Sequence, residues 1–469
     1  MCTQEKSQAE ILREQLFAAP KNTALRLDDA QLDEAYAFCE GYKTFLDVGK
    51  TERESAAYTI ELAEKNGFVP FDRNAEYKAG DKVYYNNRGK AVILCVFGKK
   101  PLSQGVKIVA SHIDSPRVDL KPNPLYEDTE LALFKTHYYG GIKKYQWTAI
   151  PLSLHGVIFR KDGTKVTVRL GDDPADPRFV ITDLLPHLGA EQSKRPLGEG
   201  IKGEELNILV GSRPFRSDSG SELVKLNILK LLNEKYGICE SDFLSAELEA
   251  VPAFNATDIG FDRSLVGAYG QDDRVCAYPS IMAAFAVADP EYTGVTVLTD
   301  KEETGSDGNT GLHSAYLKHF ISDLAQQQGL SGRDVIRASE CLSADVNAGF
   351  DPTFPSVLDK MNAAFLNRGI AITKYTGSRG KGGTSDANAE FMAKVCSIME
   401  ENGVAWQVGE LGKVDEGGGG TVAKYIANLG ADVIDVGVPV LSMHAPFEIT
   451  AKLDVYMAYK GFAAFLAQK

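Results

Sequence analysis

Histidine and carboxylate side chains, which bind divalent metal ions, recur directly after apolar segments of this sequence. The five clusters are Ser111-His112-Ile113-Asp114, Gln271-Asp272-Asp273-Arg274, Asp300-Lys301-Glu302-Glu303, Asp345 and His444. Because the chain has only 7 histidines, a metal site must depend mainly on carboxylates. Two histidines with three or four carboxylates suit a co-catalytic pair of divalent ions such as zinc, with one free acid left to move a proton.

Each cluster taken alone also has a structural explanation. The pair Asp272-Asp273 could cap the helix that follows it, and Glu302-Glu303 could be a solvated charge pair. In a strand, residues i and i+2 face the same way, so Asp114 can reach the His112 imidazole while the other ring nitrogen binds metal. The conjunction of the clusters favours a metal site. The neighbouring glutamates could then divide two roles, one as general base and one as metal ligand.

The elements that must position these residues alternate between helix and strand. Helical spacing of apolar residues predicts helices over 29–46, 52–65, 275–288, 312–326, 386–401, 421–428 and 451–467. Short β-branched runs predict a hairpin over 82–96 and strands over 106–110, 295–298, 341–345, 404–408 and 433–436. This alternation predicts a largely parallel sheet covered on both faces, with a ligand site at the carboxyl ends of the strands.

The middle of the chain does not show this alternation of helices and strands. Residues 118–252 contain proline-rich joints, a hairpin over 156–170 and a single amphipathic helix over 221–236. We therefore expect an α/β catalytic domain with a mixed, largely parallel sheet, built from residues 1–117 and 253–469 and interrupted by a smaller β-rich inserted domain over 118–252.

Composition limits the function classes. The 469 residues are 44% hydrophobic and 25% charged, as in ordinary globular proteins. A net charge of −13 argues against a nucleic-acid binder. No apolar run approaches the length of about 18 residues that a membrane span needs, and the polar start, Met1 to Lys6, predicts a cytoplasmic protein without a signal peptide. The 7 cysteines are scattered, which predicts reduced thiols.

The motifs occur in an order that identifies a family resemblance. Ser111-His112-Ile113-Asp114-Ser115-Pro116, Gln271-Asp272-Asp273-Arg274, Asp300-Lys301-Glu302-Glu303-Thr304-Gly305-Ser306, Ser343-Ala344-Asp345 and Ser442-Met443-His444 resemble the aspartyl aminopeptidase family of di-zinc metallopeptidases, in a bacterial-type branch. The resemblance covers nearly the whole chain. It implies a zinc-peptidase-like α/β/α catalytic domain interrupted by a dimerisation domain.

The resemblance also implies a ligand set with two Zn²⁺ per subunit, for which Co²⁺ or Mn²⁺ could substitute. His112 and Asp345 would bind one ion. Glu303 and His444 would bind the other ion, and Asp272 would bridge the pair.

The implied activity is removal of the N-terminal residue from peptides through a bridging water. Glu302 would be the general base for that water, and Asp114 would orient the imidazole of His112 without binding metal itself.

Three further residues are candidates for substrate contacts. By resemblance, His187 in the inserted domain would reach the active site of a neighbouring subunit, within a dodecamer built from dimers; a packed loop histidine is the alternative. Lys374 could attract an acidic first residue of the peptide or be a solvated loop charge. Gly419, in the glycine run 417–420, could hold the peptide carbonyl through backbone amides. Around Lys374 this sequence has glycines where eukaryotic-type members have a tyrosine-containing stretch. The enzyme could therefore prefer either acidic first residues or a broader range of first residues.

Two alternative functions use the same residues. One is another di-metal amide hydrolase, such as a carboxypeptidase or a deacylase, which a peptide with a blocked amino terminus would distinguish. The other is a non-catalytic assembly protein that keeps the fold, although a scaffold has no need of Glu302 beside Glu303. A phosphate-binding protein finds little support, because the glycine run 417–420 lacks the lysine of a phosphate loop.

Overall fold

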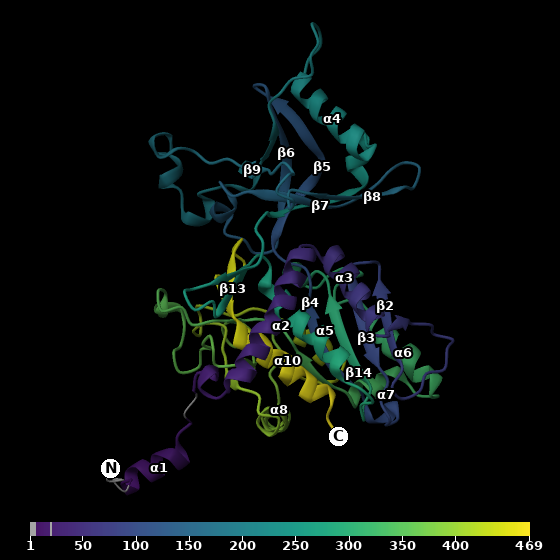
Figure 1. Ribbon diagram of the computed structural model, residues 1–469, viewed down its shortest axis with the longest axis vertical. Helices are drawn as coiled ribbons and strands as arrows, with labels where there is room; N and C mark the ends of the chain where they lie inside the picture. The colour runs from purple at the N-terminus through teal and green to yellow at the C-terminus, as the bar shows by residue number, and fades with distance from the viewer. Residues whose placement is uncertain (1–5, 19–20) are drawn as a thin grey trace.

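Two bodies stacked along the longest axis make up the molecule (Figure 1). The computed structural model describes residues 6–18 and 21–469, so Met1 to Glu5, which bear on the expected absence of a signal peptide, lie outside the described residues. The lower body contains a nine-stranded and a five-stranded sheet, and the upper body contains a seven-stranded sheet. A mixed α/β fold was predicted, and the structure confirms it.

The nine-stranded sheet forms the centre of the lower body. Its order is β1 (Val69–Pro70), β2 (Lys82–Asn87), β3 (Ala91–Val96), β14 (Gly294–Thr299), β4 (Lys107–His112), β15 (Glu340–Ser343), β19 (Asp432–Gly437), β17 (Ile370–Thr373) and β18 (Trp406–Val408). Strands β14, β4, β15 and β19 form a parallel group at the centre of the sheet. At one edge of this group β3 pairs antiparallel with β14, and at the other edge β17 pairs antiparallel with β19. Every residue of β3, β4 and β14 is buried, as expected for strands covered on both faces.

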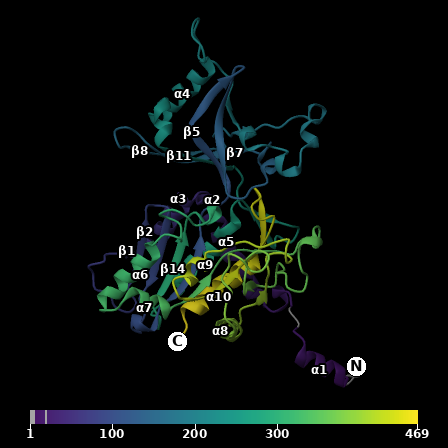
Figure 2. The ribbon, with the colours of Figure 1, turned by 180° about the vertical axis from the view of Figure 1, so that it is seen from behind.

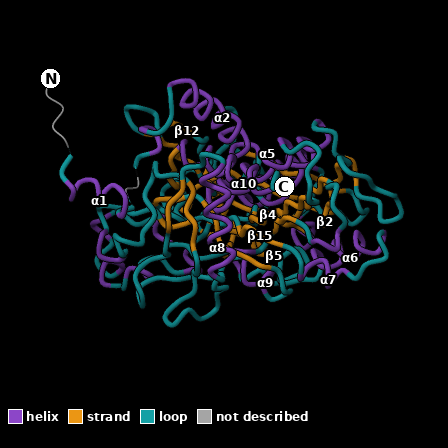
Figure 3. The backbone as a smooth tube through the Cα atoms, turned by 90° about the horizontal axis from the view of Figure 1, so that it is seen from below, coloured by secondary structure: helices purple, strands orange, loops and turns teal. Residues whose placement is uncertain are grey.

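Helices cover both faces of this sheet because side chains alternate along each strand. In β3, Val92, Leu94 and Val96 pack into one hydrophobic cluster, and Ile93 and Cys95 pack into the opposite one. The first cluster includes α2 (Asp29–Val48), α3 (Glu52–Lys65), α5 (Gln271–Ala286), α8 (Ala389–Glu401) and α10 (Lys452–Leu466). The second includes α6 (Tyr316–Gln327), α7 (Gly332–Arg337) and α9 (Ala423–Ala427). Figure 2 shows the lower body from behind, and Figure 3 shows the strands between α10 and α9.

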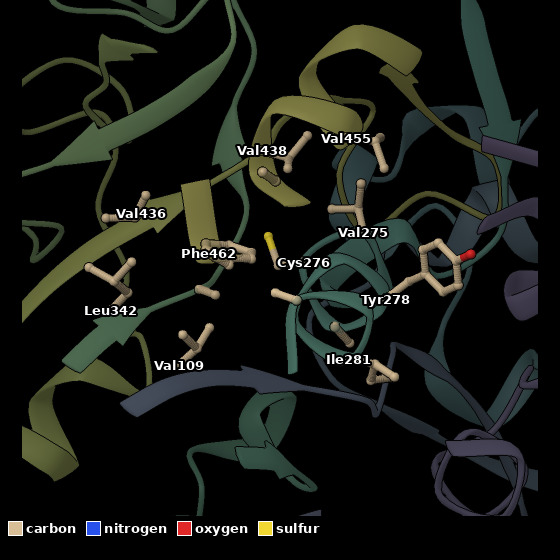
Figure 4. Packing of buried hydrophobic residues seen from close by; sticks show 14 of the residues in the cluster. Val109, Val275, Cys276, Tyr278, Ile281, Leu342, Val436, Val438, Val455 and Phe462 are labelled. Atoms are coloured by element: carbon tan, nitrogen blue, oxygen red, sulfur yellow. The ribbon is translucent and has the colours of Figure 1, made fainter. Parts of the chain in front are cut away.

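The larger cluster fixes the position of α5 on the sheet. Val275, Cys276 and Ile281 of α5 belong to one cluster with Val109 of β4 and Phe462 of α10, and Figure 4 shows Cys276 beside Phe462. All of these side chains are fully buried. Each such residue contributes about 1.5–3 kcal/mol to the free energy of folding, so the start of α5 is held firmly beside the end of β4.

Helix boundaries differ from the predicted ones at functional positions. Helix α5 begins at Gln271 instead of residue 275, but Asp272 (φ −79°, ψ 108°) and Asp273 (φ −114°, ψ 25°) depart from helical geometry. The regular helix therefore starts after the two aspartates. Helix α6 begins at Tyr316 instead of residue 312, since the preceding residues form turns in which the His313 amide donates to the Ser306 carbonyl.

Other elements had no counterpart in the sequence analysis. Helix α1 (Gln8–Leu16) has only exposed residues and begins at a Ser7/Glu10 capping box. A five-stranded sheet, β12 (Thr257–Ile259), β13 (Leu265–Ala268), β21 (Glu448–Ala451), β20 (Pro439–Leu441) and β16 (Asn347–Ala348), lies in the lower body. Its strands are too short to give a clear period-2 pattern.

The upper body is an antiparallel sheet with one helix against it. The order is β8 (Lys165–Leu170), β7 (Leu152–Phe159), β11 (Ala246–Pro252), β5 (Arg117–Asp128), β6 (Leu131–Tyr139), β10 (Ile208–Gly211) and β9 (Val180–Ile181). Helix α4 (Leu223–Tyr236) packs on this sheet through residues such as Val224 and Ile228 (Figure 1). The chain leaves the lower body through β5 and returns to it after β11.

Across the described part of the chain, none of the helices combines the length and the apolar character that a membrane crossing requires. The cysteines that the structure describes are free thiols, most of them buried.

Candidate metal centre

Three neighbouring strands bring most of the predicted residues to one edge of the nine-stranded sheet. His112 is the last residue of β4, and in the register of the sheet it lies opposite Thr299, the last residue of β14. Strand β15 runs parallel on the other side of β4, with Ser343 opposite Ala110. Because these carboxyl ends meet at one edge, the Glu302–Thr304 turn after β14 and Asp345 after β15 flank His112.

Asp272 lies between the two histidines, with one carboxylate oxygen toward each. Its Oδ1 is 3.1 Å from Nε2 of His112, and its Oδ2 is 3.1 Å from Nε2 of His444. Both histidines donate from Nδ1 to a backbone carbonyl, His112 to that of Asp114 at 3.0 Å and His444 to that of Gly141 at 2.9 Å. Those hydrogen bonds leave each Nε2 facing the aspartate, which is the arrangement of metal-binding imidazoles.

The remaining carboxylates divide between the two histidines. Oδ1 of Asp345 is 3.7 Å and Oε2 of Glu302 is 3.8 Å from Nε2 of His112. Oε2 of Glu303 is 3.5 Å from Nε2 of His444. The structure thus brings together all seven residues predicted as metal ligands or as catalytic groups in the metal centre.

Two groups of donor atoms are close enough to hold a divalent ion. One contains His112, Asp272 and Glu303, and the other contains His112, Asp273 and Asp345. Asp273 was not assigned from the sequence. Its Oδ2 accepts a hydrogen bond from the His112 backbone amide at 3.2 Å, so this carboxylate also fixes the backbone of the histidine.

Asp114 contacts three residues of the centre and holds them in position. Its Oδ1 is 3.2 Å from Nδ1 of His112, and its carboxylate accepts the amides of Glu302 at 3.1 Å and Glu303 at 3.2 Å. The Tyr139 hydroxyl donates to its Oδ2 at 2.8 Å. Burial alone would raise the pKa of Asp114, but the hydrogen bond and charge of His112 and the hydrogen bond from Tyr139 lower it below its usual value. The side chain is therefore a carboxylate that fixes three residues of the site.

The concentration of acidic groups creates an environment that favours cations. Burial, followed by the negative charges of Asp345 and Asp272, raises the pKa of Glu302 to about 8. Burial and the charge of Asp272 raise the pKa of Glu303 well above its usual value. Among the described residues, Oε1 of Glu303 is buried without a hydrogen-bond partner. A bound divalent cation relieves this repulsion and satisfies such an oxygen, so the residues fit zinc.

Sequence reasoning missed a second buried acid that supports the centre. Glu448, the first residue of β21, accepts the backbone amide of Asp272 at 3.1 Å and that of His444 at 2.7 Å. Burial and the charge of Asp272 raise the pKa of Glu448 to about 8. The signal available in the sequence was a glutamate at the start of an otherwise uncharged strand.

A cavity of about 310 Å³ opens onto the centre. It is lined by Glu302, Glu303 and His444 together with Gly141, Gly305, Gly420, Thr421, Lys424 and Tyr425. Neither Lys374 nor Gly419 is in this lining, although Gly420 is.

Three predicted substrate-binding residues lie outside the cavity of their own chain. The Lys374 ammonium lies 3.4 Å from Oδ1 of Asp386. A side chain at Gly419 would face Leu411. His187 is exposed in the short helix Pro186–Leu188 of the upper body.

A mixed α/β sheet with two histidines and several carboxylates gathered at its strand ends defines a metal-dependent enzyme. The chain belongs to peptidase family M18: residues 45–466 match the family model described as aminopeptidase I zinc metalloprotease. It is 50% identical to a probable M18 family aminopeptidase 1 of Clostridium acetobutylicum over 454 residues, which cover 95% of this chain and 98% of the relative.

Solved structures agree with this assignment. The crystal structure of an M18 aminopeptidase from Thermotoga maritima superimposes with a TM-score of 0.93 at 45% identity and covers 97% of this chain and 100% of that one. The dodecamer of mApe1 from S. cerevisiae shares the fold, with a TM-score of 0.74 at 21% identity, covering 91% of this chain and 95% of that one.

The protein is therefore a zinc-dependent aminopeptidase that removes N-terminal residues from peptides, as the motif resemblance predicted. The carboxypeptidase, deacylase and scaffold alternatives lose their support.

Proposed function

We propose that this aminopeptidase works through two zinc ions per subunit. His112 and Asp345 hold one ion, Glu303 and His444 hold the other, and Asp272 bridges them. The observation that carries the proposal is the position of Asp272, whose two oxygens each lie 3.1 Å from a different histidine. A carboxylate with one oxygen toward each imidazole is placed to serve as a ligand of both ions.

Bound zinc polarises the scissile carbonyl and lowers the pKa of water. Glu302 accepts the proton of the attacking water at its carboxylate and passes it to the nitrogen of the leaving amine. Burial and then the charges of Asp345 and Asp272 raise the pKa of Glu302, so zinc ligation of those two carboxylates would lower it and favour the ionised base. Asp114 holds the backbone of Glu302 in place through the 3.1 Å hydrogen bond to its amide.

The test combines zinc analysis with a peptide panel. The peptides differ only in their first residue and are supplied with free and with N-acetylated amino termini. We expect two zinc ions per chain and release of the first residue from the free peptides alone. One zinc ion per chain at full activity would refute the bridged pair, and cleavage of the acetylated peptides would refute recognition of the free amine.

We further propose that the enzyme prefers acidic first residues. Lys374 follows strand β17 and carries a positive charge, although it lies outside the cavity and pairs with Asp386 at 3.4 Å. Lys424 lies in the lining of the cavity itself. Asp and Glu peptides should therefore be cleaved faster than Leu and Met peptides, and Lys374→Ala should reduce the difference. An unchanged preference in that variant would transfer the role to Lys424, and equal cleavage of all the peptides by the unmodified enzyme would refute the preference.

Residues 118–252 are proposed to be an inserted dimerisation domain within a catalytic domain of residues 1–117 and 253–469. Exposed leucines surround His187 in this domain: Leu184, Leu185, Leu188 and Leu197 are 50–70% exposed in the single chain. Such an apolar surface is typical of a protein interface, and it supports contact of His187 with a second subunit in a dodecamer built from dimers. A cytoplasmic location remains a prediction, which the free thiols support.

A further inference from the structure

Residues Tyr139, Gly140 and Gly141, here called the 139–141 segment, connect the upper body to the metal centre. Tyr139 ends β6 of the upper sheet, and the two glycines follow it. The segment contacts residues on both sides of Asp272, although it belongs to neither of the strand-end clusters that provide the ligands. No part of the proposed catalytic chemistry requires it.

On the His112 side, the contact is made by the tyrosine hydroxyl. It donates to Oδ2 of Asp114 at 2.8 Å. Asp114 in turn accepts a hydrogen bond from Nδ1 of His112 at its backbone carbonyl, and its Oδ1 lies 3.2 Å from the same nitrogen. The Tyr139 ring is held in the upper body by Arg117, whose guanidinium lies 3.9 Å from the ring centroid. Arg117 is itself buried and pairs with Glu249 of β11 at 3.3 Å. The hydroxyl therefore has a fixed position relative to the upper sheet.

On the His444 side, the contacts are made by the glycine backbone. The carbonyl of Gly141 accepts from Nδ1 of His444 at 2.9 Å and so directs Nε2 toward Asp272. Gly140 has a φ of +74°, and a Cβ atom there would lie 3.3 Å from Cβ and from Oε2 of Glu303. Only glycine adopts this backbone conformation at low cost and also avoids a close contact with the Glu303 side chain.

We propose that the 139–141 segment is a positioning element that sets the geometry of both zinc ligand groups and couples zinc binding to the seating of the upper body. Tyr139 acts through Asp114 on the His112 group, and Gly140 with Gly141 acts on the Glu303 and His444 group. This inference rests on the proposed zinc pair. Groups that orient metal ligands in this way typically change metal affinity by about 10- to 100-fold when they are removed.

The test uses two variants of the full-length zinc enzyme, each with a matched control. Tyr139→Phe removes the hydroxyl and keeps the ring over Arg117; its control, Tyr138→Phe, removes the hydroxyl of the neighbouring, 39% exposed tyrosine. Gly140→Ala is matched by Gly163→Ala, a hairpin glycine with a similar φ of +82° and open space around its Cβ position. Zinc release to a chromophoric chelator is followed for each protein, with thermal unfolding as the measure of intact structure.

We expect Tyr139→Phe to loosen one zinc ion and Gly140→Ala the other, each by about tenfold or more, while both controls release zinc like the unmodified enzyme. With cobalt in place of zinc, the visible spectrum of each variant should also shift. Equal release from variants and controls would overturn the inference, whether the enzyme holds one zinc ion or two. The number of zinc ions in the unmodified enzyme separately tests the proposed pair. If Gly140→Ala unfolds, Tyr139→Phe alone decides, because it changes a single oxygen atom.

Discussion

Replacement of Glu302 by glutamine separates proton transfer from metal binding in this enzyme. The side chain lines the cavity, and its Oε2 lies 3.8 Å from Nε2 of His112, farther than the oxygens of Asp272 and Asp345. Its backbone amide is held by Asp114. Glutamine has nearly the same shape and keeps that backbone contact, so Glu302→Gln should bind zinc normally while lacking a carboxylate to accept a proton.

The expected size of the effect follows from the role of the group. A positioned general base typically contributes about 10²- to 10⁴-fold to the rate, which corresponds to about 3–5 kcal/mol in the activation free energy. Because the variant keeps the zinc ligands and the cavity, the loss should fall on kcat and leave KM nearly unchanged. Removal of one negative charge from a site that already crowds several should not unfold the protein.

The assay is release of the first residue from an unblocked peptide, together with zinc analysis of the same preparation. Glu303→Gln is the matched control, since it makes the same exchange one residue away at a proposed ligand. We expect this control to lose zinc together with activity, whereas Glu302→Gln loses activity alone. Full turnover of Glu302→Gln with normal zinc content would refute Glu302 as the base, and loss of zinc from it would refute the division of roles between the two glutamates.

Further perturbations test the bridge, the junction between the bodies and the assembly. Asp272→Ala should lose both zinc and activity, because the carboxylate common to both histidines is gone; retention of two zinc ions on metal analysis would contradict the bridge. His155 is fully buried between Glu54 and Asp172, and although burial opposes it, hydrogen bonds to these acids raise the pKa of the imidazole above its usual value. A raised folded-state pKa stabilises the fold fully below the unfolded pKa of about 6.5, and this contribution is lost as pH rises through the folded value. His155→Gln should therefore lower the free energy of unfolding by about 3 kcal/mol near pH 6 and by less near pH 9 in urea titrations; an equal loss at both would show that the imidazole is not charged. Leu188→Asp, which adds a charge to an exposed leucine of the upper body, should reduce the assembly mass in sedimentation, and an unchanged mass would place the subunit interface elsewhere.

Local sequence signals predicted the regular elements well where a single pattern acted alone. Helix α3 spans Glu52–Lys65, the predicted range, because Thr51 and Glu54 form a capping box at its start and Asn66-Gly67 follows its end. Strands β2 and β3 likewise form the hairpin predicted over 82–96, since a turn separates their two runs. The predicted bounds were less accurate where site residues interrupt a regular element. Asp272 and Asp273, for example, lie within α5 but depart from helical geometry.

The sequence by itself indicated seven residues that meet at the centre and the end of the sheet that they occupy. His112, Glu302 and Asp345 each follow an apolar strand, and parallel strands that share an edge must bring such residues together. That inference needs only the order of elements and the direction of the strands, both of which are encoded locally.

Only the tertiary structure decided how the residues face one another. The two oxygens of Asp272 meet imidazoles 160 residues earlier and 172 residues later in the chain, and no local pattern reports that relation. The contacts of Glu448 with the Asp272 amide and of His444 with the Gly141 carbonyl are equally hidden, because nearly every residue carries these backbone groups. Hydrogen-bond geometry of this kind arises when distant segments pack, and so it depends on the folded arrangement instead of on residue type.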